Sequence, residues 1–241
     1  MNRQTESVCS PETSVSIDYD RFLDNWTYPS RLTATLREQA LFASVLAERA
    51  QIAQQWFQSL QAATQAYPQQ CQPVLWPDLP LFYEAGDQHD KVVHNRNMEH
   101  TCYRIEHLAL AYQTCPSCHT ADMRHAITHA LTVMLTHLYR EGARSTGNWW
   151  EWEIAVPKSL YSTCALMRDT LPTSLIAQLN RASRYITPTP YWEHHARERH
   201  ARRCGHTAPI WSIWRSWCYY EPCLNKMMMT LPWRWRRSRP H

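Results

Sequence analysis

Residues 121–139 read ADMRHAITHALTVMLTHLY, a stretch that contains neither glycine nor proline. Apolar side chains recur in it every three or four positions and therefore fall on one face of a helix. They are Met123, Ile127, Ala130, Met134 and Leu138. This spacing predicts a helix over 121–140. Because an amphipathic helix must cover its apolar face with neighbouring elements, we expect the flanking sequence to supply packing partners.

The same spacing, interrupted by prolines, predicts four further helices on either side of this stretch. Their ranges are 31–67, 97–112, 157–170 and 172–185. No convincing strand lies between them, and four glycines in 241 residues are few for a protein built from tight β-turns. We therefore predict an all-α fold, in which successive antiparallel pairs suit an α/α toroid or a helix bundle.

Composition divides the chain into a polar segment over 1–30, a helical domain over 31–201 and a basic tail over 202–241. The tail holds eight basic residues, one acidic residue and five of the 12 tryptophans. One hypothesis is that this tail is an out-of-frame translation, since such readings are rich in Trp, Cys, Met and Arg. The alternative is a genuine basic tail that binds a membrane surface or nucleic acid through Trp and Arg.

A loop joins the helix predicted over 121–140 to the helix predicted over 157–170. It contains the sequence GNWWEWEIAVP, residues 147–157. Three of four consecutive residues in it are tryptophan. They could form a buried cluster, the usual environment of an indole, or they could stack on the apolar faces of sugar rings. A third interpretation, in which Glu151 and Glu153 form an acid/base pair for glycoside hydrolysis, is less favoured because they are only two positions apart.

The run NWWEWEIAVP resembles the NWWDWEIGxP signature of polysaccharide lyase family 8, which includes hyaluronate, chondroitin AC and xanthan lyases. The likeness extends to residues 103–112, which resemble an arginine-bearing helix, and covers about 20–201. It implies an incomplete α/α toroid with a long cleft. It also implies that Trp149 and Trp150 form an aromatic patch that orients the polymer beside Asn148, and that Arg104 contacts substrate.

Two positions depart from the signature. Glu151 replaces aspartate and keeps the charge, whereas Ala155 replaces glycine. An alanine is tolerated there only if its backbone φ angle is negative.

The resemblance implies β-elimination beside a uronic acid, in which an Asn neutralises the carboxylate while a Tyr, helped by a His, moves the proton. In the family the Asn lies in a TGAN-type segment soon after the point that matches His200. This chain reads ARRCGH over 201–206 instead, and the later His and Tyr have no counterpart. We therefore assign no catalytic residue and expect an inactive fragment that retains the sugar-binding patch.

The sequence Cys115-Pro116-Ser117-Cys118-His119 matches the attachment pattern of c-type haem. It could also contribute to a zinc site, but no second ligand pair lies at a suitable spacing. Our preferred interpretation is an ordinary connection between helices. We expect no cofactor and no metal.

The resemblance implies an anionic polysaccharide partner of the hyaluronan, chondroitin or xanthan type and a monomer, with no nucleic acid and no membrane. It implies an extracellular or periplasmic location, although the first residues contain no apolar segment typical of a secretory signal. Three other functions stay open. They are a non-catalytic carbohydrate-binding helical module, a basic interaction protein acting through residues 202–241, and a c-type haem protein.

Overall fold

The structure is a computed structural model that describes residues 35–67, 72–83 and 91–187. Every regular element in these ranges is helical, which confirms the all-α prediction. The longest helix is α2 (Leu36–Ala66), followed after a proline-rich segment by α3 (Lys91–Thr114). Residues 1–30 and 202–241 lie outside the described ranges, so the predicted terminal segments stay predictions.

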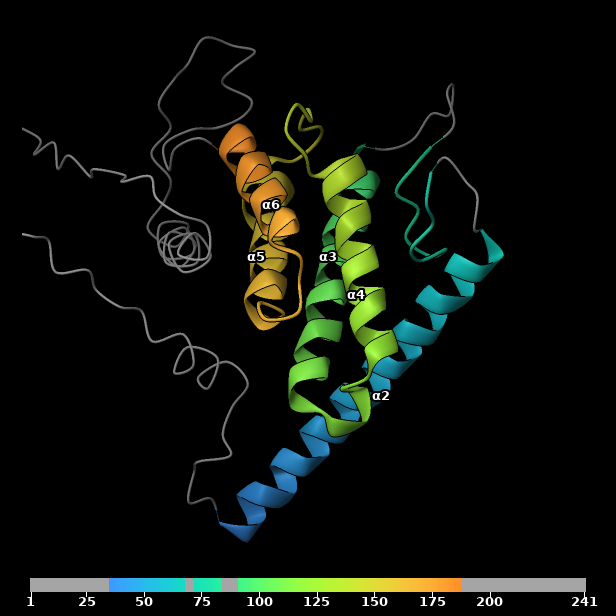
Figure 1. Ribbon diagram of the computed structural model, residues 1–241, viewed down its shortest axis with the longest axis vertical. Coiled ribbons are helices and arrows are strands. Elements are labelled where there is room, and N and C mark those ends of the chain that lie inside the picture. The colour runs from blue at the N-terminus through green and yellow to red at the C-terminus, as the bar shows by residue number, and fades with distance from the viewer. Residues whose placement is uncertain (1–34, 68–71, 84–90, 188–241) are drawn as a thin grey trace, which may run out of the picture.

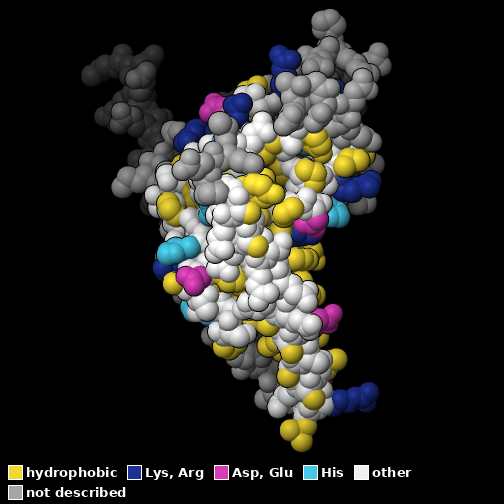
Figure 2. Space-filling view, turned by 90° about the vertical axis from the view of Figure 1, so that its right-hand side faces the viewer, with side chains coloured by type: hydrophobic (Ala, Val, Ile, Leu, Met, Phe, Trp, Pro, Cys, Tyr) yellow, Lys and Arg dark blue, Asp and Glu magenta, His cyan; other side chains and the backbone are white. Residues whose placement is uncertain are grey.

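Helix α2 begins at a capping box, in which Thr35 and Glu38 satisfy each other's free backbone groups. The Glu38 backbone N–H donates to Thr35 Oγ1 at 3.3 Å, and the Thr35 N–H donates to Glu38 Oε2 at 2.7 Å. The first half of α2 extends beyond the bundle, and Leu36 and Leu41 are exposed there (Figures 1 and 2). Its second half packs on the core through Ala53, Phe57, Leu60 and Ala63.

The remaining helices form two antiparallel pairs (Figure 1). In the first pair, α3 is joined through the short 3-10 helix η1 (Pro116–Cys118) to α4 (Ala121–Val133), which continues as the π-helical segment η2 (Met134–Leu138). In the second pair, the π-helical segment η3 (Glu151–Ala155) leads into α5 (Val156–Leu166), and α6 (Thr173–Ile186) returns alongside it. The two pairs pack together through α3 and α5.

Helix α3 is the centre of the domain because α2, α4 and α5 all pack against it. It buries apolar residues along most of its length, namely Met98, Cys102, Ile105, Leu108, Ala109, Ala111 and Tyr112. No helix in the described ranges is both long enough and apolar enough to cross a membrane.

Most predicted helix ends agree with the structure to within about five residues, and the exceptions are two helix starts. Helix α3 begins at Lys91 rather than at residue 97, and the helix predicted from residue 157 already begins at Trp149. The extra residues of α3, 91–96, include only two apolar side chains, Val92 and Val93, and both are exposed, so no buried apolar stripe marks them. Side-chain contacts hold these residues instead, including one of 3.0 Å between His94 Nε2 and the Leu81 carbonyl.

Candidate functional site

The tryptophan-rich segment begins in a tight turn at Gly147. This glycine has a φ of +71°, a conformation that other residues adopt only with strain. Directly after it, Asn148 Oδ1 accepts a hydrogen bond of 3.3 Å from the Trp150 backbone N–H. Such a contact satisfies a free donor at a helix start. The helix therefore begins at Trp149, and our prediction that Trp149 and Trp150 lie on a loop is wrong.

Two residues further on, the helix widens into the π-helical segment η3. The Val156 backbone N–H donates to the Glu151 carbonyl, five residues back instead of four. Pro157 follows at once, and in a regular α-helix its ring would clash with the carbonyl four residues before it. The change of hydrogen-bonding register ahead of Pro157 lets the helix continue through the proline. From the sequence, Pro157 indicated that a new helix starts there. The φ of Ala155 is −68°, as its replacement of glycine required.

The third tryptophan of the segment anchors the helix start. Trp152 is 4% exposed, and its Nε1–H lies 3.2 Å from Asn95 Oδ1 and 3.1 Å from the Thr146 carbonyl. Asn95, which is fully buried on α3, also donates through Nδ2 to the Thr146 carbonyl. These bonds fix the turn at Thr146 and Gly147 to the first turns of α3. Trp152 thus belongs to the core, whereas Trp149 and Trp150 lie nearer the surface.

Trp149 and Trp150 are both half-buried. Their ring centroids lie 6.2 Å apart and their planes meet at 74°, an edge-to-face arrangement. Neighbouring positions on a helix point about 100° apart, so two adjacent indoles cannot form one flat platform. The planes of the two indoles therefore meet at a corner, and each indole can orient a different ring of a ligand.

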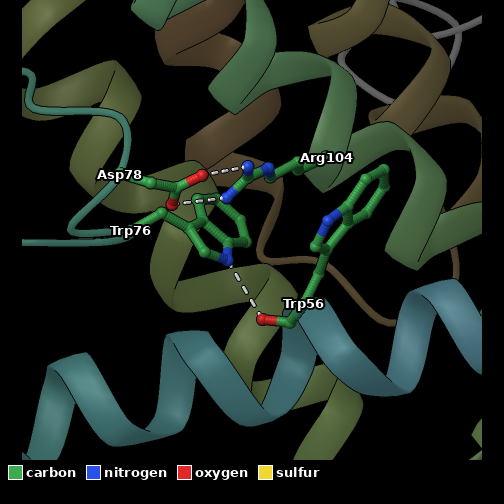
Figure 3. Close-up of polar contacts among 4 residues, drawn as sticks. All are labelled: Trp56, Trp76, Asp78 and Arg104. Atoms are coloured by element: carbon green, nitrogen blue, oxygen red, sulfur yellow. Dashed lines mark hydrogen bonds and ion pairs between the residues drawn. The ribbon is translucent and has the colours of Figure 1, made fainter.

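Arg104, on α3, contacts residues of α2 and of the 72–83 segment (Figure 3). Its guanidinium carbon is 5.4 Å from the ring centroid of Trp56 on α2 and 5.5 Å from that of Trp76 in the 72–83 segment. Both distances are in the range of cation–π attraction. The Trp76 Nε1–H donates to the Trp56 carbonyl at 3.0 Å, which ties the two indole-bearing segments together.

The guanidinium forms a bidentate ion pair with Asp78. Arg104 Nη1 donates to Asp78 Oδ1 at 2.9 Å, and Nη2 donates to Oδ2. The hydrogen bonds from Arg104 lower the pKa of the Asp78 carboxyl, so this group is ionised near neutral pH. The sequence does not mark Asp78, Trp56 or Trp76 as partners of Arg104. These residues lie 26 to 48 positions from Arg104, and no motif links them to it.

The structure brings together three of the four predicted site residues, Asn148, Trp149 and Trp150, at the start of one helix. Arg104 is separated from this group. It lies nine residues after Asn95 on α3, which is about 13 Å along the helix and about half a turn around it. Since Asn95 faces the tryptophan segment, Arg104 faces away from it, towards α2 and the 72–83 segment. Its role as a substrate contact stays a prediction.

Acidic side chains gather behind the patch, where η3 packs on α3. Glu151 and Glu153 are 7% and 1% exposed, which excludes them as an accessible acid/base pair in this conformation. Burial, followed by the charge of Glu151, raises the pKa of Glu99 on α3. Glu151 and Glu153 are thus buried and Glu99 is partly buried, and no group of three or more His, Cys, Asp or Glu in the described ranges is arranged to hold a metal ion.

The Cys115–His119 motif forms the connection between α3 and α4. Both thiols are buried, and Cys115 Sγ lies 3.5 Å from the Leu46 carbonyl on α2. The His119 ring stacks on Tyr112, with centroids 4.2 Å apart. Haem attachment would require both thiols to leave the core, so this packing supports our preferred interpretation of the motif as an interhelical connection.

Comparison with known proteins identifies the helical domain. The family model for "Polysaccharide lyase family 8, N terminal alpha-helical domain" matches residues 32–207. A hyaluronate lyase of Thermasporomyces composti is 32% identical over 117 residues, which are 47% of this chain and 14% of that protein. A xanthan lyase of Bacillus sp. (strain GL1) is 30% identical over 89 residues, which are 36% of this chain and 10% of that protein.

Two solved structures share the fold. A Paenibacillus xanthan lyase superposes with a TM-score of 0.56 at 21% identity, covering 72% of this chain and 16% of its own. A Streptomyces coelicolor A3 chondroitin AC lyase in complex with chondroitin sulphate superposes with a TM-score of 0.53 at 20% identity, covering 70% and 21%. These likenesses confirm the predicted incomplete α/α toroid of antiparallel pairs. The chain spans about a fifth or less of the length of these relatives.

Proposed function

Since this chain belongs to polysaccharide lyase family 8, as part of its N-terminal α-helical domain, we propose that it binds an acidic polysaccharide without cleaving it. Trp149 and Trp150 are the proposed binding surface. The relatives' names refer to hyaluronate and xanthan, and one solved relative is complexed with chondroitin sulphate. Each of these polymers is anionic, so we propose this chemical class as the ligand.

The observation that carries the proposal is the way in which the two indoles are presented. They stand half-buried at the start of a helix whose first turn is fixed to α3 through Trp152, Asn95 and Thr146. A sugar ring that stacks on an indole removes apolar area from water and becomes oriented by the ring. Because the helix that carries the indoles is fixed to α3, little backbone freedom has to be lost on binding.

The absence of cleavage is proposed from the sequence after residue 200. Elimination in this family needs an Asn to neutralise the uronate, together with a Tyr and a His to move the proton. The segment that would carry this Asn has no counterpart where the resemblance places it, since residues 201–206 read ARRCGH. Asn148 lies beside the indoles, where its amide can hydrogen-bond to a hydroxyl or a carboxylate.

The test is affinity electrophoresis through gels that contain hyaluronan, chondroitin sulphate or xanthan. The parent chain should be retarded in at least one gel. Trp149→Ala and Trp150→Ala should each weaken binding by about 1–3 kcal/mol, the usual range for aromatic stacking sites, and abolish detectable retardation. Because the two ring faces meet at a corner, each substitution removes a separate contact.

Tyr67→Ala provides the control, since Tyr67 is an aromatic residue with 43% exposure at the end of α2. This variant should migrate as the parent does, and circular dichroism should give the same helical spectrum for all variants. If the double tryptophan variant stays folded and is retarded as strongly as the parent, the patch is structural and the proposal fails.

A further inference from the structure

Arg104 is held in place independently of its ion pair. Its guanidinium lies between the rings of Trp56 and Trp76, and the two segments that carry these rings are joined by the Trp76 to Trp56 hydrogen bond (Figure 3). Trp76 is fully buried, so this arrangement is part of the core. Cation–π attraction acts on the positive charge of the guanidinium and does not use up its N–H groups, which stay available for hydrogen bonding.

Asp78 accepts hydrogen bonds from these N–H groups. The Arg104 side chain is 16% exposed, whereas the Asp78 side chain is 58% exposed, so the carboxylate lies on the solvent side of the pair. The two nitrogens that donate to Asp78 are the fork by which arginine binds any carboxylate in a bidentate manner. A carboxylate that arrives from solvent would therefore bind where Asp78 now lies.

We propose that Asp78 is an internal competitor, which occupies the place on Arg104 that the carboxylate of a uronic acid would take. This inference rests on the proposed binding of acidic polysaccharide and adds a second contact region, on the α2 side of the domain. Opening of the Asp78–Arg104 pair sets how readily this region accepts an acidic sugar. A neutral sugar gains nothing there, because it has no carboxylate to replace that of Asp78.

The exposure of Asp78 permits exchange. A bidentate arginine–carboxylate pair is stronger than an ordinary surface ion pair, but the 58% exposed carboxylate is already in contact with water and is hydrated again when the pair opens. When Asp78 swings into solvent, the two indoles still hold the guanidinium, so the binding site persists. An incoming uronate would restore both hydrogen bonds, and each uronate along a polymer offers the same group.

Asp78→Asn is the decisive variant, because it removes the competing charge from an exposed side chain while keeping its shape. Binding to hyaluronan should tighten by at least about threefold, the size expected if the ion pair between Asp78 and Arg104 is closed most of the time. Binding to carboxyl-reduced hyaluronan, which is neutral, should not change. The added Arg104→Lys substitution keeps the charge but loses the bidentate fork, so it should cancel the gain.

Asp169→Asn is the matched control. Asp169 is 71% exposed and pairs with Arg168 at 2.9 Å, so the substitution makes the same change in net charge at another surface ion pair. It should leave hyaluronan binding unchanged. If Asp78→Asn binds no more tightly than the parent, or if Asp169→Asn produces an equal gain, Asp78 is not a competitor at Arg104.

A second readout separates this inference from the proposed function. The Arg104 Nε–H resonance is followed by NMR while glucuronate, or glucose as a neutral control, is added to Asp78→Asn. A saturable shift with glucuronate alone supports the inference even if no polymer is retarded in gels, in which case only the proposed function fails. No shift with glucuronate overturns the inference, even if Trp149 and Trp150 prove to bind polymer.

Discussion

Trp152 donates a hydrogen bond of 3.2 Å from Nε1 to Asn95 Oδ1, joining two buried residues that are 57 positions apart. The bond ties the first turns of α3 to the helix that presents Trp149 and Trp150. A buried polar group that loses its partner costs about 1–3 kcal/mol, so neither residue can change without consequence for the other. This pair thus links the stability of the domain to the geometry of the patch.

Trp152→Phe keeps most of the ring but removes the indole N–H. We expect it to lower the free energy of unfolding by about 1–3 kcal/mol, since Asn95 Oδ1 loses the closer of its two donors and keeps only Thr146 Oγ1 at 3.4 Å. Asn95→Ala should also destabilise the domain. Because the residues are direct partners, the double variant should lose less than the sum of the single losses, with a coupling of about 0.5–3 kcal/mol. Urea denaturation of all four proteins measures this, and strictly additive losses would contradict the assigned bond.

Gly147→Ala should destabilise the domain more than Gly142→Ala. Both glycines have positive φ angles, of +71° and +82°, so both substitutions cost about 1–2 kcal/mol in backbone strain. A Cβ atom at Gly147 would also lie 2.6 Å from Asn95 Nδ2, whereas at Gly142 the nearest atom is the flexible end of Arg140 at 3.7 Å. Thermal unfolding of the two variants gives the comparison. Equal losses would show that Gly147 does not pack closely against Asn95.

Glu99→Gln should stabilise the domain at neutral pH. Burial and the charge of Glu151 raise the pKa of Glu99 in the folded chain, while Arg96, His100 and Lys158 lower it less. The ionised group therefore costs stability above its folded pKa, and this cost disappears as the pH falls below its unfolded value. The advantage of glutamine should be present at pH 7 and absent near pH 4.

Urea midpoints at the two pH values measure this effect. Glu48→Gln, at an exposed position on α2, controls for the loss of one negative charge. An advantage of Glu99→Gln that persists unchanged at pH 4 would show that the charge of Glu99 is not its cause.

The chain by itself should show no lyase activity. Incubation with hyaluronan, chondroitin or xanthan should give no rise in the ultraviolet absorbance of unsaturated uronate, because no residue is assigned to move the proton or to neutralise the carboxylate. A rise that persists in a preparation free of contaminating lyase would show that catalytic residues are present at positions other than those that the resemblance implies.

Periodicity predicted the helices where apolar packing forms them. The stripe from Met123 to Leu138 predicted a helix over 121–140, and the structure has helical residues over 121–138. The first turns of α3 escaped prediction because they depend on His94 and Asn95, whose partners at Leu81 and Thr146 are distant in sequence. Polar side chains of this kind are indistinguishable from loop residues until their partners are known.

The candidate site was predicted in composition but not in geometry. The run 148–150 marked the aromatic residues, yet Pro157 indicated a helix start when the helix already begins at Trp149. For Arg104, the resemblance supplied a role but not an environment. Its contacts with Trp56, Trp76 and Asp78 form only when α2 and the 72–83 segment fold against α3.

The π-helical segment η3 carries one residue more than an α-helix would need to cover the same backbone. Deleting a single residue from 151–155 would remove the wide turn, and the ring of Pro157 would then meet the carbonyl four residues before it, as in a regular α-helix. All side chains before the deletion would turn by about 100° relative to α5. Trp152 could then no longer reach Asn95, and the two indoles before it would point to a different side of the domain. The direction in which this surface faces is thus encoded in the length of the segment as much as in its residue types.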